Sequence, residues 1–159
     1  MSGFDFTSVL GKAVDDVVPP PRLPTGTYRW VGTKVQFPAP RSGSEWARIV
    51  FICQCVEAGD DVDPEMLAEF GDLSSAKNNV TFLFPTGENE EHGRQASEVR
   101  MLTFLRDHCG IEVSGTGIML QEYVDAYPHS QFFGEIEWQP NEDNPEVPYV
   151  RITGTAPLS

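Results

Sequence analysis

Aromatic and basic side chains are interleaved in two neighbouring segments of this chain. The segment GTYRWVGTKVQF carries Arg29, Trp30 and Lys34, and the segment that begins at Trp46 carries Arg48 two residues later. Aromatic rings stack on the bases of nucleic acids, and Lys and Arg neutralise phosphates. The interleaving therefore favours a surface that binds a single-stranded nucleic acid and does not catalyse a reaction on it.

The overall charge argues, at first sight, against a polyanionic partner. The 159 residues include 24 acidic and 11 basic side chains, for a net charge of −13. The charge is unevenly distributed, because the segment from Pro19 to Ile49 holds five basic residues and one acid, Glu45, for a local balance of +4 against −17 for the rest. We therefore expect one positive surface on an acidic body.

Strict alternation in these two segments predicts a pair of β-strands, residues 27–37 and 46–57. In the second strand the residues predicted to face the core are Ala47, Ile49, Phe51, Cys53 and Cys55. In the first strand we expect Val31, Thr33, Val35 and Phe37 to face the core, with Tyr28, Trp30, Gly32, Lys34 and Gln36 outside. The turn-rich link 38–44 predicts a hairpin that brings Trp30, Lys34, Trp46 and Arg48 to one side, with Arg41 at its tip.

The last strand, within VPYVRITGTA, offers a further pair of binding residues. Val150 and Ile152 alternate toward the core, which leaves Tyr149 and Arg151 outside for one stacking and one phosphate contact. The predicted nucleic-acid-binding residues are thus Arg29, Trp30, Lys34, Arg41, Trp46, Arg48, Tyr149 and Arg151. Among the other large aromatics, Phe51, Phe82, Phe84, Phe104, Phe132 and Trp138 are predicted to be core residues.

No constellation indicates catalysis or a metal site. Cys53 and Cys55 form a C-x-C pair without a second pair at ligand spacing, so they are predicted to be core thiols. The three histidines are scattered, and no serine or cysteine lies in a recognisable nucleophile motif. We expect no enzyme activity, no metal and no cofactor.

The order of predicted elements suggests the fold. Two long strands are followed by a short helix at 64–70, a third strand near 78–87, a helix at 95–109, a less regular helical segment near 117–127, and a final hairpin. Five strands with helical insertions around the third are typical of a mainly β protein with a five-stranded OB-fold, a Greek-key barrel, although a β-sandwich also fits the strand content. Residues 1–23 are predicted to be a partly flexible arm, and 24–159 the nucleic-acid-binding domain.

Several segments resemble the OB-fold single-stranded DNA-binding proteins encoded by phages. They are PTGTYRWVGTKVQF, RSGSEWARIVFICQCVEAG, SEVRMLTFLRDHCGI and the terminal FFGEIEWQP with VPYVRITGTAP, which together cover residues 24–157. The resemblance implies sequence-independent protection of single-stranded DNA during replication or recombination, in the cytoplasm of the bacterial host cell. It also implies partners among the replication proteins of phage or host, for which the acidic segment 57–72 is a candidate contact.

The composition sets limits on location and assembly. The odd number of cysteines, three, indicates a reducing compartment, and no apolar run approaches the roughly 18 residues that a membrane-spanning helix requires. The arm 1–23 is a candidate for pairing two subunits in a homodimer.

Two other functional classes fit the same composition. The first is an acidic protein-interaction module, such as a DNA mimic or a phage inhibitor of a host protein, and the second is a virion structural protein. A continuous positive stripe along Lys34, Arg41 and Arg48 favours DNA binding, whereas a surface that is negative throughout favours mimicry.

Overall fold

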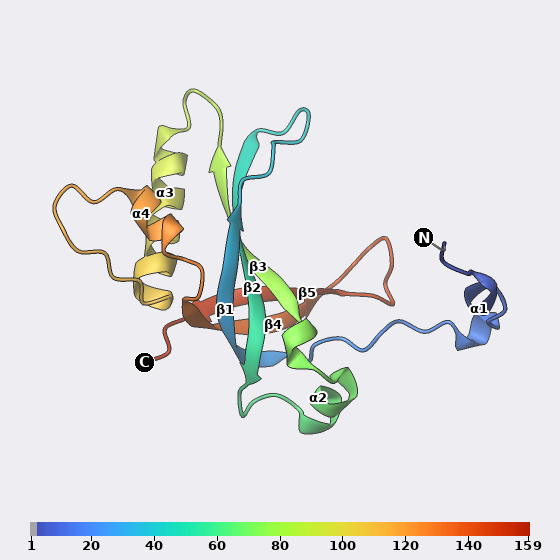
Figure 1. Cartoon of the computed structure of the whole chain (residues 1–159). Coiled ribbons are helices and arrows are strands. Elements are labelled where there is room, and N and C mark those ends of the chain that lie inside the picture. The colour runs from blue at the N-terminus through green and yellow to red at the C-terminus, as the bar shows by residue number, and fades with distance from the viewer. Residues whose placement is uncertain (1–2) are drawn as a thin grey trace.

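A five-stranded antiparallel sheet organises the chain in the computed structural model, which describes residues 3–159 (Figure 1). The strands are β1 (Gly26–Gln36), β2 (Trp46–Ala58), β3 (Lys77–Pro85), β4 (Gln131–Gln139) and β5 (Tyr149–Ala156). Their spatial order is β3-β2-β1-β4-β5. The expectation of a mainly β chain with inserted helices is confirmed, and β1 and β2 form the predicted hairpin.

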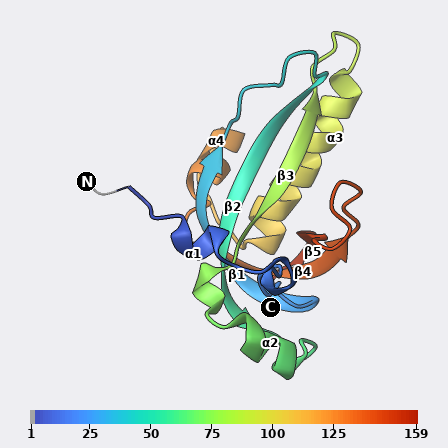
Figure 2. The same cartoon turned by 90° about the vertical axis from the view of Figure 1, so that its right-hand side faces the viewer.

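Helices lie in the arm before β1, in the loops between strands and against the inner side of the sheet. They are α1 (Thr7–Leu10), η1 (Val14–Asp16), α2 (Pro64–Phe70), η2 (Leu73–Ser75), α3 (Glu91–Leu102), the π-helical turn η3 (Thr103–His108) and α4 (Leu120–Asp125). The predicted start of α2 is confirmed, since Asp63 caps it and Pro64 takes its first position. Figure 2 shows α3 running alongside the edge strand β3, with β1 farther from the helix.

The sheet does not close into the barrel that the element order predicts. No ladder joins the edge strands β3 and β5 in the described part of the chain. The Asn78 side-chain amide donates to the Val150 carbonyl at 3.0 Å, and farther along Val99 of α3 and Phe104 of η3 line the gap between the two edges. Helix side chains therefore occupy the place where backbone pairing would complete a barrel.

A β-bulge reverses the alternation predicted for the first strand. Gly32 is paired with Cys53 and Lys34 with Ile52, so Thr33 is an extra residue on β1. Such a residue moves everything beyond it to the opposite face. Consequently Tyr28, Trp30 and Gly32 face the core, and the prediction that they lie outside is wrong, whereas Lys34 is outside and Val35 packs inward as predicted.

The bulge is held by a turn from the far end of the chain. The Gly32 N–H donates to Ser130, and the His129 N–H donates to the Gly32 carbonyl. A Cβ at position 32 would lie 2.7 Å from the Tyr127 carbonyl oxygen, so only glycine permits this approach. His129 completes the turn with a φ of 73°.

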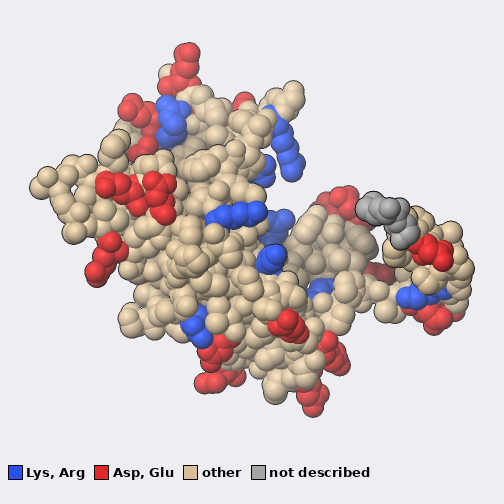
Figure 3. All heavy atoms as spheres, viewed as in Figure 1, with Lys and Arg blue, Asp and Glu red and all other residues tan. Residues whose placement is uncertain are grey.

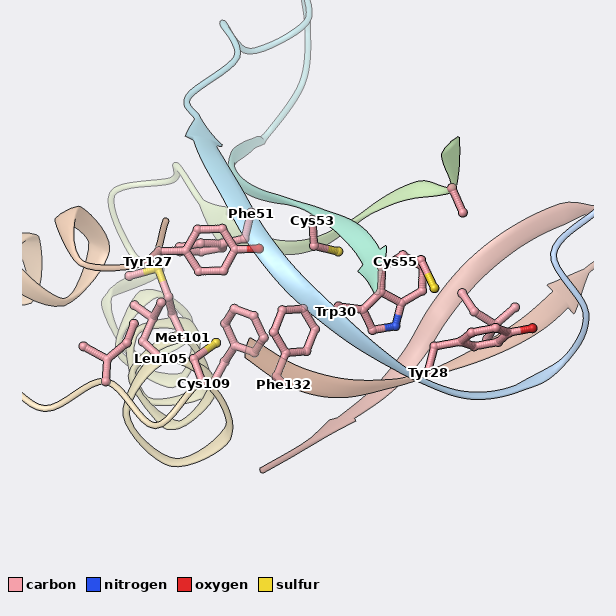
Figure 4. Close-up of a cluster of buried hydrophobic side chains, with 14 of the residues drawn as sticks. Tyr28, Trp30, Phe51, Cys53, Cys55, Met101, Leu105, Cys109, Tyr127 and Phe132 are labelled. Carbon is pink, nitrogen blue, oxygen red and sulfur yellow. The ribbon is translucent and has the colours of Figure 1, made fainter. Parts of the chain in front are cut away.

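Aromatic rings fill the space between the curved sheet and the helices (Figure 4). Phe51 makes edge-to-face contacts with Phe104 and Tyr127, and Phe104 makes another with Phe132. Such geometries place ring edges against ring faces, which adds to the free energy gained from apolar burial. Phe51 and Phe104 are therefore core residues as predicted, and Phe82, Phe84 and Trp138 pack against the same cluster.

The segment before β1 joins the body at Leu23 and Pro24, which are both buried. The Trp138 indole N–H donates to the Leu23 carbonyl at 2.8 Å, and the Tyr28 hydroxyl donates to the Pro24 carbonyl at 2.7 Å. Residues 3–21 are exposed throughout and project away from the sheet with α1 at their far end (Figure 1). None of the helices in residues 3–159 has the length and apolar character to cross a membrane.

Candidate nucleic-acid interface

The candidate site lies on the side of β1, β2 and β3 that faces away from the aromatic core. We call this side the outer face. It carries Lys34 and Gln36 of β1, Arg48, Val50, Ile52 and Gln54 of β2, and Lys77, Asn79, Thr81 and Leu83 of β3. None of these ten positions is acidic, and Glu57 of β2, farther along the same side, is paired with Arg29 of β1.

Strand register fixes the arrangement of the basic side chains on the outer face. Lys34 lies beside Ile52, which lies beside Asn79 on the third strand. Lys77 lies beside Gln54, one outward position along. Arg48 lies four residues from Ile52 on β2, or about 13 Å at the usual rise per residue. The charges are thus spread over three strands, as an extended polyanion requires.

The basic residues of the outer face keep their charge free of ion pairs. Within residues 3–159 the ion pairs are Arg29 with Glu57 and Arg106 with Asp107. Figure 3 shows Lys and Arg gathered over the middle of this side of the molecule, while Asp and Glu lie mainly around its margin. Lys34 and Arg48 lie on the outer face, and Arg41 lies in the exposed link between β1 and β2. The acidic average thus conceals a locally positive face.

Arg29 is committed to contacts within the protein. Its guanidinium donates to Glu57 at 2.7 Å and to the Gln131 side chain at 2.7 Å. The two contacts link β1 to β2 on one side and to β4 on the other. Arg29 therefore contributes to the cohesion of the sheet, and a phosphate would have to compete with Glu57 for it.

The two tryptophans predicted to stack on bases have opposite environments. Trp30 is fully buried, with its indole N–H donating to the Gly134 carbonyl at 3.2 Å, so its predicted stacking role is wrong. Trp46 is 47% exposed at the start of β2 and lines a hollow with Glu45 and Glu90. Of the two, only Trp46 presents a ring to solvent, and acidic groups flank it.

Tyr149 and Arg151 lie outside as predicted. The Arg151 guanidinium lies 4.7 Å from the centre of the Tyr149 ring, a cation–π contact. With Asn79 and Thr81 of β3 they line a groove of about 460 Å³ along the gap between β3 and β5. The outer face therefore continues over the edge of β3 to a second aromatic and basic pair.

The third strand contributes outer-face residues that are not among those predicted from the sequence. Lys77, Asn79 and Thr81 lie on the outer face because β3 pairs with β2 in a register that places them beside Gln54, Ile52 and Val50. The strict alternation of KNNVTFLFP, with Val80, Phe82 and Phe84 on one side, could have identified them.

Part of the acidic segment 57–72 has a structural explanation. Asp63 accepts backbone N–H groups at the start of α2, and Asp72 accepts one at the start of η2. Asp61 accepts the Thr27 N–H and hydroxyl, and these bonds hold the pKa of Asp61 below its usual value. Hydrogen bonds from Ser74 lower the pKa of Asp72 in the same way. These three carboxylates stabilise turns.

The cysteines are core thiols, as predicted. Burial raises the pKa of Cys53 to about 12, that of Cys55 to about 11 and that of Cys109 to about 12. All three are free, and they are protonated at neutral pH. In the described range, residues 3–159, no group of three or more His, Cys, Asp or Glu side chains is arranged to hold a metal ion.

No protein-family model matches the chain, and neither does any curated protein.

Proposed function

We propose that this protein binds single-stranded DNA without sequence preference, through the outer face of β1, β2 and β3. The observation that carries the proposal is the unpaired positive charge of Lys34, Arg48 and Lys77 on one side of a chain whose net charge is −13. Lys and Arg that neutralise phosphates supply most of the affinity in sequence-independent binding. Acidic residues around the margin direct a polyanion to this face.

The exposed aromatics supply the second component of such binding. Trp46 at one end of the outer face and Tyr149 beyond its β3 edge offer rings on which bases stack. Each stacked base is worth about 1–3 kcal/mol and is read through its face, so the contact tolerates any sequence. Ile52 and Val50 provide apolar area between the charges.

The strand order supports an OB-fold origin for the site. The order β3-β2-β1-β4-β5 is that of a five-stranded Greek-key barrel opened between its third and fifth strands. OB-folds bind oligonucleotides on the face of strands 2 and 3, flanked by the loop between strands 1 and 2. Here that face holds Arg48 and Lys77, and that loop holds Arg41. By resemblance, the protein would act on phage DNA in the bacterial cytoplasm.

The test is a fluorescence-anisotropy titration of labelled oligonucleotides of about 25 nucleotides over a range of salt concentrations. We expect preference for single over double strands and a negative slope of log affinity against log salt. Lys34→Ala, Arg48→Ala and Lys77→Ala should each weaken binding and reduce the slope by about one. Trp46→Ala should weaken binding without changing the slope.

The matched control is Arg106→Ala, which removes the same charge from the exposed surface of η3. It should leave affinity and slope unchanged. An equal loss with Arg106→Ala would show that only net charge matters, which contradicts the assignment of the outer face. Absence of salt-sensitive binding by the native protein would overturn the proposal and favour the acidic protein-interaction module, tested by host-protein pull-downs.

A further inference from the structure

The arm that precedes β1 exposes apolar side chains over residues 3–21, and no other described residue covers them. Phe4 is 69% and Phe6 60% exposed, and their rings form an edge-to-face pair with centroids 4.9 Å apart. Val9 and Leu10 of the adjoining helix α1 are exposed too. We call Phe4, Asp5 and Phe6 the arm knob. Exposure of these two rings to water is unfavourable, and their burial in an apolar cleft would lower the free energy.

A cleft of matching character lies between β3, α3 and β5, on the core side of the gap between the two edge strands. Its volume is about 340 Å³. Its apolar lining consists of Val80, Phe82, Val99, Phe104 and Ile152. We call it the α3 cleft. Its size falls within the ordinary range of apolar binding pockets, and Val99 is 65% exposed at its rim.

Charge distinguishes the α3 cleft from most of the surface. Arg100 and His108 are among its lining residues, and those residues include no Asp or Glu. The arm from residue 3 to 21 carries Asp5, Asp15 and Asp16 against Lys12 alone. Asp5 separates the two aromatic rings of the knob. An apolar knob with one acid therefore complements an apolar cleft that has the guanidinium of Arg100 among its lining residues.

The connection between arm and body favours a cleft on another molecule. Pro19, Pro20 and Pro21 lie between the arm and the anchored Leu23. Consecutive prolines adopt an extended, semi-rigid conformation of about 3.1 Å per residue. Figure 1 shows the arm leading away from the body. A stiff spacer that points outward presents the knob to a second chain and opposes its return to its own.

We propose that the arm knob of one copy of this chain occupies the α3 cleft of a second copy. The α3 cleft shares Val80 and Ile152 with the groove that Tyr149 and Arg151 line, but none of its lining residues belongs to the outer face, so this contact leaves Lys34, Arg48 and Lys77 open to DNA. Each chain has one arm and one cleft, so the contact assembles either a reciprocal dimer or a head-to-tail series.

Disulfide trapping between two differently sized copies tests the proposal. One copy carries Phe6→Cys, the other Val99→Cys with a size tag, and the native thiols are buried. Under oxidation we expect a linked heterodimer. Replacing Val99→Cys by Glu88→Cys, an exposed site on the loop before α3, should give about tenfold less product. Equal yields from both pairs would overturn the proposal.

A single chain that carries both Phe6→Cys and Val99→Cys tests whether the α3 cleft is occupied by the chain's own arm instead of the arm of a second copy. Intramolecular linkage at low protein concentration, with no product between copies, would assign the cleft to the chain's own arm and contradict the proposal. No linkage in either arrangement would contradict it too, since the knob would then be directed at a different partner.

Sedimentation equilibrium of the full chain tests the chemistry of the contact. Phe4→Ser with Phe6→Ser should weaken self-association about tenfold, because two apolar rings are lost. Asp5→Arg and Arg100→Glu should each weaken it about two- to fivefold, and the two together should restore it. Additive losses in the double variant would exclude this charge pairing, and a native protein monomeric at every concentration would overturn the proposal.

Discussion

Gly32 lies where another segment leaves no room for a side chain. A Cβ there would come within 2.7 Å of the Tyr127 carbonyl oxygen, a backbone atom that the surrounding turn holds in place. We expect Gly32→Ala to lower the free energy of unfolding by about 1–3 kcal/mol, as overpacking does. Urea unfolding measures the change.

Gly154 on β5 is the matched control for that substitution. A Cβ at position 154 meets nothing within 4 Å, and its backbone φ lies outside the positive range. Gly154→Ala should therefore leave the stability unchanged or slightly increased. Equal losses at both positions would contradict the steric role assigned to Gly32.

Trp30 shows why individual site residues are harder to predict than strands. The alternation of its segment predicts a strand, but which residues of that strand face the core depends on the bulge at Thr33. That bulge depends on the turn at 127–130, almost a hundred residues away. Lys34 lies beyond the extra residue, where the predicted face and the observed face agree. A local pattern cannot contain this information, because a distant segment sets the register.

Asp61 ties the start of β1 to the loop that follows β2. It accepts the Thr27 N–H at 3.0 Å and the Thr27 hydroxyl at 2.9 Å, and its pKa is lowered as a result. A carboxylate with a lowered folded-state pKa stabilises the fold above its unfolded-state pKa, and the contribution is lost as pH falls through the folded value. We expect Asp61→Asn to reduce stability at neutral pH and to flatten the loss of stability below about pH 4.

Thermal unfolding of the native protein and the Asp61→Asn variant across the acidic range checks this expectation. Asp60→Asn, at the exposed neighbouring position, removes the same charge and serves as control. A parallel acid profile for the native protein and Asp61→Asn would contradict the role of the Thr27 contact.

Most elements could be predicted because their determinants are local. Asp63 and Pro64 specify the start of α2, and Gly110, with φ of 67°, follows the helical segment that ends at His108. The open edge between β3 and β5 could not be predicted in this way. It depends on where Val99 and Phe104 of the helix pack against both strands, which is a tertiary property.

At the scale of the whole molecule, the buried ionisable groups predict sensitivity to alkali. Burial raises the pKa of Cys53 and Cys109 to about 12, and it also raises the pKa of Tyr28 and Tyr127. A group with a raised folded-state pKa stabilises the fold below its unfolded-state value, and this contribution is lost as pH rises through the folded value. Stability should therefore decline above about pH 9, by up to about 2 kcal/mol per thiol at about pH 10.5.

Urea unfolding at neutral and alkaline pH measures the decline. Cys109→Ala removes one of the thiols, and the cavity it leaves costs the same free energy at every pH. The variant should therefore lose less stability between the two pH values than the native protein does. A difference between native protein and variant that stays constant with pH would contradict the account.

The position of β1 gives the sheet an unequal resistance to opening. β1 is paired on both sides, with β2 and with β4, while among residues 3–159 no strand pairs with the outer edge of β3 or of β5. Amide hydrogens can exchange with solvent where a strand separates from its neighbour, and separation is easiest at an unpaired edge. Hydrogen exchange should therefore begin at the β3 and β5 edges and reach the centre of β1 last. The sheet thus opens from the gap between its two edge strands toward its middle strand.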